Sequence, residues 1–102
     1  MKKSIQGQTL ILSITEGLTA NKIASYNEEL DKIAPTFSEF NELLLDLEQT
    51  NNIDSTGVTF VIGLFKKAKA LGLNFCVIGA NSDVQSLFKL MKLDQFFEMK
   101  NQ

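Results

Sequence analysis

Apolar and polar residues alternate near the start of the chain, with the period of two that is typical of a β-strand. Leu10, Leu12 and Ile14 lie at every second position and share one face. The preceding residues 6–8 predict a hairpin turn to a short edge strand. The predicted strands along the whole chain span residues 3–5, 9–14, 40–48, 73–78 and 95–99.

The segments between these strands have the spacing of amphipathic helices. The first predicted helix has an apolar stripe at spacings of three and four residues: Ile23, Tyr26, Leu30 and Ile33. Thr19 is its candidate N-cap, and Pro35 ends it. A second stripe lies on one face of residues 58–71: Val58, Val61, Ile62, Phe65 and Ala68. A capping-box pattern that begins at Ser82 predicts a third, short helix.

The order of the predicted elements gives the fold class. Leu43–Leu47 and Leu73–Ile78 are nearly continuous apolar runs, as expected for buried parallel strands. With the helix between them they form a right-handed βαβ unit. The full order, β-β-α-β-α-β-α-β, predicts an α/β domain with a mixed, mostly parallel sheet and helices packed on it.

Composition narrows the class of protein further. The chain has 102 residues, 44% of them hydrophobic, which suits a single domain over residues 1–102. The net charge is −2 and all ten cations are lysines, so we expect no nucleic-acid partner. No apolar run is long enough to span a membrane. The lone Cys76 cannot form an internal disulfide, and we therefore expect a cytoplasmic protein with no membrane contact.

The absence of histidine excludes several kinds of active site. A Ser-His-Asp triad, a histidine general base and histidine metal ligands are all impossible in this chain. One cysteine is too few for structural zinc. We therefore expect no enzymatic activity, no cofactor and no metal.

The turn from Ile53 to Gly57 lies between a buried strand and the start of a helix. If Asp54 is the N-cap, Ile53 and Val58 occupy the N′ and N4 positions of a hydrophobic staple. If Ser55 is the cap, that staple is lost. We therefore predict that Asp54 caps the helix and that Ser55 occupies N1 with an exposed hydroxyl. Free amides and the helix dipole make N1 favourable for a phosphate.

Several motifs of the chain resemble the STAS domain of bacterial anti-sigma-factor antagonists. The resemblance covers roughly residues 4–98 and rests on four segments: residues 44–48, 53–58, 63–68 and 75–78. It implies that Ser55 is the phosphoacceptor, supported by Asp54, Thr56 and Gly57 of the motif. It also implies two partners: an ATP-binding switch kinase, often itself the anti-sigma factor, and a PP2C-type phosphatase. The unphosphorylated protein would bind the kinase, and phosphorylation would release it.

Two departures from the family pattern concern surfaces. The turn before the first helix reads Glu16-Gly17-Leu18-Thr19 where relatives often have Gly-Glu-Leu-Asp, and this turn contributes to the partner surface. No final helix is evident after the last predicted strand, which leaves a face exposed or available for self-association. The candidate partner-facing residues are Thr19, Asn52, Thr59, Phe60, Gly63 and Leu64. For Phe60 and Leu64 the alternative is a place in the core.

Other functions remain as alternatives to the switch. The domain could be a non-phosphorylated scaffold or interaction subunit in a signalling or lipid-transport assembly. An aspartyl-phosphate receiver also has a parallel sheet with a carboxylate after a strand. A receiver, however, needs an acidic pair after its first strand and a lysine after its last, and neither residues 15–16 nor residues 98–100 supply these convincingly. We therefore reject the receiver.

Overall fold

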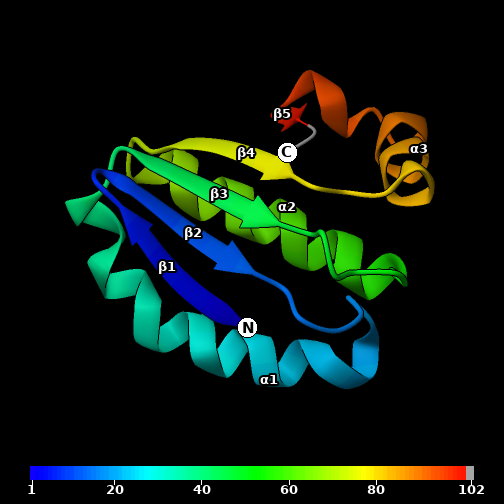
Figure 1. Cartoon of the computed structure of the whole chain (residues 1–102), viewed down its shortest axis with the longest axis horizontal. Coiled ribbons are helices and arrows are strands. Elements are labelled where there is room, and N and C mark those ends of the chain that lie inside the picture. Colours follow the sequence, from blue (N-terminus) through cyan, green and yellow to red (C-terminus); the bar gives the residue numbers. More distant parts are fainter. Residues whose placement is uncertain (101–102) are drawn as a thin grey trace.

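The computed structural model describes residues 1–100 and has a five-stranded sheet in the order β1-β2-β3-β4-β5 (Figure 1). The strands are β1 (Lys2–Gln6), β2 (Thr9–Ser13), β3 (Glu42–Asp46), β4 (Asn74–Ile78) and β5 (Glu98–Lys100). β1 is antiparallel to β2, and every other neighbouring pair is parallel. The register aligns Leu10 with Leu43 and Leu43 with Phe75, which produces a continuous apolar row across the sheet. The predicted α/β class and mixed sheet are confirmed.

The helices supply the second layer of the fold. They are α1 (Ala20–Ile33), α2 (Ser55–Ala70) and α3 (Ser82–Leu90), with 3₁₀ helices η1 (Ala34–Glu39) and η2 (Leu93–Gln95). α1 and α2 run along one face of the sheet (Figure 1). Leu43 and Leu45, which point to that face, are fully buried, whereas Leu44 between them is only partly buried. The core therefore lies between the sheet and these two helices.

Several predicted boundaries need correction. The predicted strands at residues 3–5 and 40–48 are Lys2–Gln6 and Glu42–Asp46 in the structure. The last strand is Glu98–Lys100, because residues 93–95 form the η2 turn in place of extended chain. The cap of α3 is Asn81, not Ser82: the Asn81 side chain accepts a hydrogen bond from the Val84 amide at 2.9 Å. The chain after Pro35 continues as η1, which periodicity did not predict. The question of a final helix falls on residues 101–102, which lie outside the described residues.

The buried face of α2 differs in part from the predicted stripe. Phe60 and Leu64 are 6% and 1% exposed, so both belong to the core. Ile62 and Phe65, predicted to be buried, are only partly so. The reason is the position of α1, which covers the Phe60 side of α2 and brings the Tyr26 ring within 6.0 Å of the Phe60 ring.

The start of α2 packs closely against the loop between β2 and α1. Leu18 forms an isolated parallel bridge with Ile53: the Leu18 amide donates to the Asn52 carbonyl at 2.9 Å, and the Asp54 amide donates to the Leu18 carbonyl at 3.1 Å. Gly57 lies directly over this bridge. A Cβ at Gly57 would clash with the Leu18 carbonyl oxygen and would lie 2.8 Å from its carbonyl carbon. Only glycine allows this approach.

We therefore predict opposite effects of the same substitution at two glycines of α2. Gly57→Ala should lower the free energy of unfolding by about 1–3 kcal/mol, since the Leu18 backbone must move. Gly63→Ala should raise it by about 0.5–1 kcal/mol, because a Cβ there meets no atom within 4 Å. Urea unfolding followed by circular dichroism measures both. Equal stability of the two variants would contradict the close packing of α2 on Leu18.

Candidate functional site

One carboxylate caps two helices at the candidate site. Asp54 Oδ1 accepts a hydrogen bond from the Gly57 amide in the first turn of α2, at 2.9 Å. Its Oδ2 accepts one from the Ala20 amide, the first residue of α1, also at 2.9 Å. The prediction that Asp54 caps α2 is confirmed. Thr19 does occupy the N-cap position of α1, but its hydroxyl bonds the Asn21 side chain and caps no amide.

Ionisation of Asp54 is favoured by these two contacts. The hydrogen bond from the Ala20 amide, and next that from the Gly57 amide, lowers the pKa of the Asp54 carboxyl from its ordinary value of 3.8. Both amides lie at positive helix N-termini, which also stabilise a negative charge. Asp54 is therefore an anion at neutral pH.

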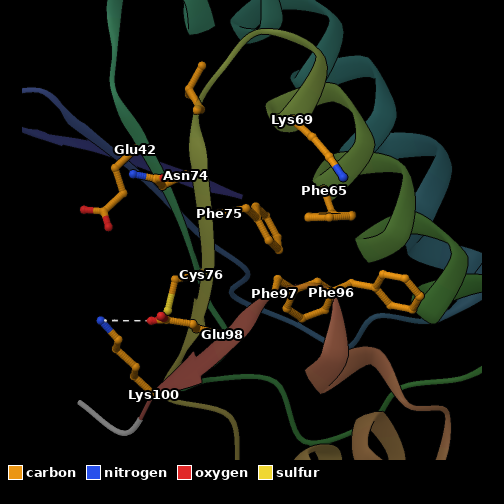
Figure 2. A pocket seen from close by; sticks show the side chains of 11 residues that line it. Glu42, Phe65, Lys69, Asn74, Phe75, Cys76, Phe96, Phe97, Glu98 and Lys100 are labelled. Carbon is orange, nitrogen blue, oxygen red and sulfur yellow. Dashed lines mark ion pairs between the residues drawn. The ribbon is translucent and has the colours of Figure 1, made fainter.

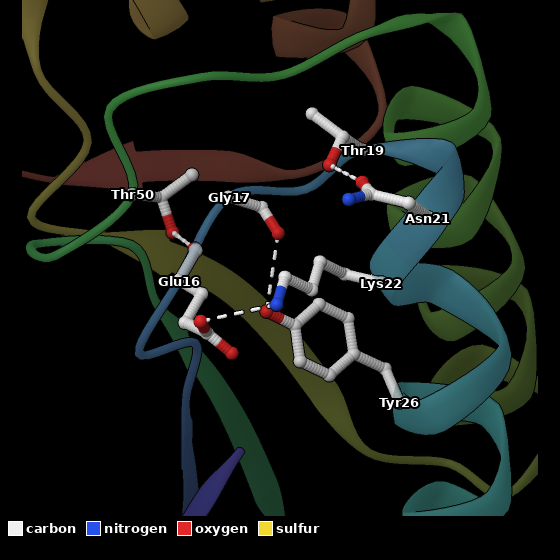
Figure 3. A network of polar contacts seen from close by, with 7 residues as sticks. All are labelled: Glu16, Gly17, Thr19, Asn21, Lys22, Tyr26 and Thr50. Atoms are coloured by element: carbon white, nitrogen blue, oxygen red, sulfur yellow. Dashed lines mark hydrogen bonds and ion pairs between the residues drawn. The ribbon is translucent and has the colours of Figure 1, made fainter.

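The loop before α1 is held by a polar network (Figure 3). The Thr50 hydroxyl donates to the Glu16 carbonyl at 3.3 Å, and the Tyr26 hydroxyl donates to the Gly17 carbonyl at 3.1 Å. Lys22 forms an ion pair with the Glu16 carboxylate at 3.1 Å. Burial, followed by the nearby Glu16 charge, raises the pKa of the Tyr26 hydroxyl, so this group remains a donor. The network fixes the loop against which α2 starts.

Ser55 lies at N1 of α2 and is exposed, as predicted. Within residues 1–100 its hydroxyl has no hydrogen-bond partner, while its carbonyl accepts from the Thr59 hydroxyl at 3.0 Å. Ile53, the predicted staple residue, is partly buried and packs against the core that contains Val58. The hydroxyl of Ser55 is therefore presented to solvent on a backbone that is fixed on both sides.

A groove of about 360 Å³ runs between α1 and α2 beside this serine. Its apolar lining comes from both helices: Ile23, Leu30, Phe60 and Leu64. Its other lining residues are Asn27, Thr56, Thr59, Gly63 and Lys67.

The groove brings together most of the candidate partner residues. Thr59, Phe60, Gly63 and Leu64 line it, with the buried Phe60 and Leu64 as its floor and not as a protruding strip. The remaining candidates, Thr19 and Asn52, flank the Leu18–Ile53 bridge in sequence and do not line the groove. That α1 contributes residues to the groove was not predicted. The apolar stripe of α1 at Ile23 and Leu30 was the available signal for it, because an amphipathic helix must place that stripe against a neighbour.

Within the described part of the chain, no three His, Cys, Asp or Glu side chains are grouped so that they could hold a metal ion. No helix among residues 1–100 is long and apolar enough to cross a membrane.

The double cap predicts a pH-dependent contribution to stability. Asp54→Ala should lower the urea midpoint at pH 7, because the amides of Ala20 and Gly57 lose their acceptor. The contribution of ionised Asp54 to stability is complete above the pKa that its carboxyl has in the unfolded chain. It is lost as the pH falls through the lowered pKa of the same carboxyl in the folded protein. The difference from wild type should therefore narrow in acid below about pH 4, the range set by the ordinary carboxyl pKa.

The matched control is Asp31→Ala, which removes an exposed carboxylate of α1 that forms no ion pair or side-chain hydrogen bond with any residue from 1 to 100. Its effect on the urea midpoint at pH 7 should be small. A loss as large as that of Asp54→Ala would mean that general charge, and not the double cap, determines stability here.

Three solved structures of other proteins have a fold similar to that of this chain. Thermotoga maritima TM1081 has a TM-score of 0.88 at 19% identity, over 99% of this chain and 86% of that chain. RsbS of Moorella thermoacetica has a TM-score of 0.77 at 20% identity, over 99% and 86%. The phosphorylated form of Bacillus SpoIIAA, a cell fate determinant, has a TM-score of 0.74 at 13% identity, over 99% and 89%.

These likenesses establish the fold. The sequence model of the STAS domain matches residues 1–102. The chain therefore belongs to the STAS domain family.

Proposed function

We propose that the chain is a phosphorylation-controlled protein-interaction switch of the anti-sigma-factor-antagonist type. With Ser55 unphosphorylated it binds an anti-sigma factor that is also a serine kinase, and phosphorylation of Ser55 releases that partner. A PP2C-type phosphatase restores the binding form. The observation that carries the proposal is the exposed Ser55 hydroxyl at N1 of α2, which has no hydrogen-bond partner within residues 1–100 and lies beside the carboxylate that caps two helices.

Local electrostatic terms at Ser55 oppose one another. A phosphate adds about 1.5 to 2 negative charges at neutral pH. The first-turn amides and dipole of α2 favour it, whereas the Asp54 carboxylate repels it. Because the surrounding backbone is held by the Leu18–Ile53 bridge, the fold should change little. The charge then acts on the partner, where like-charge contacts cost several kcal/mol.

The groove between α1 and α2 is the surface that we assign to the partner. Its floor offers apolar contacts, and Thr56, which follows Ser55 in α2, is one of its lining residues. Apolar side chains of the partner would enter the groove while polar groups approached Ser55. A phosphate at Ser55 would therefore meet the edge of the same interface. In this proposal the chain is the substrate of another enzyme and catalyses nothing itself.

The first prediction from this proposal concerns charge at Ser55. Ser55→Ala should keep full affinity for the partner, while Ser55→Glu should weaken it at least tenfold, which is about 1.4 kcal/mol. Ser82→Glu is the matched control, because Ser82 is an exposed serine at N1 of α3. Isothermal titration calorimetry measures all three. Equal affinity of Ser55→Ala and Ser55→Glu would contradict the switch.

The partner for these titrations comes from capture with the Ser55→Ala chain as bait. The captured protein, once purified, must phosphorylate the wild-type chain with ATP. Mass spectrometry should locate the phosphate on Ser55 and not on Ser82. A captured protein without kinase activity on Ser55 would favour a scaffold role instead.

A further prediction tests the groove without touching the phosphoacceptor. Gly63→Gln should leave the protein folded, because nothing lies within 4 Å of the position of the new Cβ. Its longer side chain would fill the groove and should reduce partner affinity by tenfold or more. Ala70→Gln places the same side chain at an exposed site at the end of α2 and should bind as wild type does. Full affinity of Gly63→Gln would move the interface elsewhere.

A further inference from the structure

A second hollow lies on another flank of α2, away from the groove beside Ser55. It has a volume of about 320 Å³ and lies between α2 and the segment that follows α3. We call it the aromatic trough, and its lining is Ile62, Phe65, Leu93, Phe96 and Phe97 with Lys66 and Lys69. The groove and the trough share no residue. One chain could therefore use both surfaces at the same time.

The aromatic side chains of the trough are held in place from beneath. The buried Phe97 ring lies 5.1 Å from the Phe75 ring, 5.5 Å from the Phe65 ring and 6.3 Å from the Phe88 ring. Figure 2 shows Phe65, Phe75 and Phe97 between α2 and β4, with Phe96 beside Phe97. Since Phe97 points inward, its neighbour Phe96 is directed outward and is 62% exposed. An exposed aromatic residue beside a hollow is typical of an interaction site.

The trough continues into a larger hollow along the outer edge of β4 (Figure 2). β5 pairs with Cys76–Ile78, so within residues 1–100 no strand pairs with the start of β4 on that side. This larger hollow has a volume of about 540 Å³ and shares Phe65, Lys69, Phe96 and Phe97 with the trough. The larger hollow has mixed charge, because Glu42 and Glu98 line it together with Lys69 and Lys100. The trough, by contrast, is lined by lysines without carboxylates among the described residues.

The charge of the trough indicates the chemistry of its occupant. Among residues 1–100, Lys66 and Lys69 are the only charged residues that line it. Neither forms an ion pair with any residue from 1 to 100, and the Lys69 ammonium lies 5.9 Å from the centre of the Phe65 ring. A ligand with an apolar anchor and adjacent carboxylates would complement both the aromatic lining and the two free cations.

We propose that the aromatic trough is a second docking surface, which binds an acidic peptide segment of a partner protein through an aromatic or aliphatic anchor residue. The anchor packs on the exposed Phe96 ring, whose centre lies 6.5 Å from that of Phe65. Acidic residues next to the anchor pair with Lys66 and Lys69. The surface goes beyond the proposed switch, because Ser55 takes no part in it.

The test is selection of twelve-residue peptides from a random phage-displayed library against the full wild-type chain. Selected peptides should carry Asp or Glu beside a large apolar residue. Their affinity, measured by fluorescence anisotropy, should fall at least tenfold with Phe96→Ser and with Lys66→Glu/Lys69→Glu. The matched control is Lys67→Glu, a charge reversal on the same helix that faces the other groove. It should leave peptide affinity unchanged. Circular dichroism checks that each variant is folded.

Three results would overturn the proposal: no selected peptides, selected peptides without acidic residues, or binding that is indifferent to Phe96→Ser. Vesicles of phosphatidylcholine and phosphatidylglycerol provide a separate arm. If these vesicles bind the chain through Phe96 while no peptide does, the surface is a membrane contact and the peptide proposal is wrong. Every arm of the test can be repeated with Ser55→Ala. Failure of peptide binding at the trough therefore leaves the switch proposal intact, and failure of the switch leaves the trough proposal intact.

Discussion

The arrangement of the candidate site depends on the two hydrogen bonds that Asp54 accepts. One carboxylate holds the first turns of α1 and α2, which are 34 residues apart along the chain between Ala20 and Asp54. Without it, two helix N-termini would meet with unsatisfied amides. The groove between the helices and the presentation of Ser55 both follow from this shared anchor. The acid before the serine therefore has a structural role, and the hydrogen bonds of that role lower the pKa of its carboxyl further.

The sequence allowed the fold and half of this anchor to be predicted. Period-two and helical spacing located the strands and helices, and the staple of Ile53 with Val58 distinguished Asp54 from Ser55 as the cap. The contact with Ala20 could not be predicted, because it depends on how the β2–α1 loop lies against α2. The cap of α3 was misplaced by one residue for a different reason: Asn81 and Ser82 are both good N-caps, and local pattern alone did not separate them.

The burial of α2 marks another limit of periodicity. The spacing shows that the helix has apolar residues on several sides, but not which flank a neighbour covers. α1 covers Phe60 and Leu64, and the short segment after α3 leaves Phe65 only partly covered. The length of that segment's strand was also overestimated, because the η2 turn uses residues that could equally have been extended. The share of α1 in the groove and the whole of the aromatic trough are therefore tertiary features that the sequence did not reveal, whereas the α2 residues Thr59, Phe60, Gly63 and Leu64 of the groove were predicted as candidates.

The close seating of Gly57 on Leu18 bears on how fast such a site can respond. Such close packing leaves the first turn of α2 little room to shift against the β2–α1 loop. In the switch that we propose, the time course at Ser55 would then be set by the enzymes that add and remove the phosphate. The domain itself would return to the same conformation whenever the phosphate is removed. Its concentration, and not a conformational equilibrium, would determine how much partner it can hold.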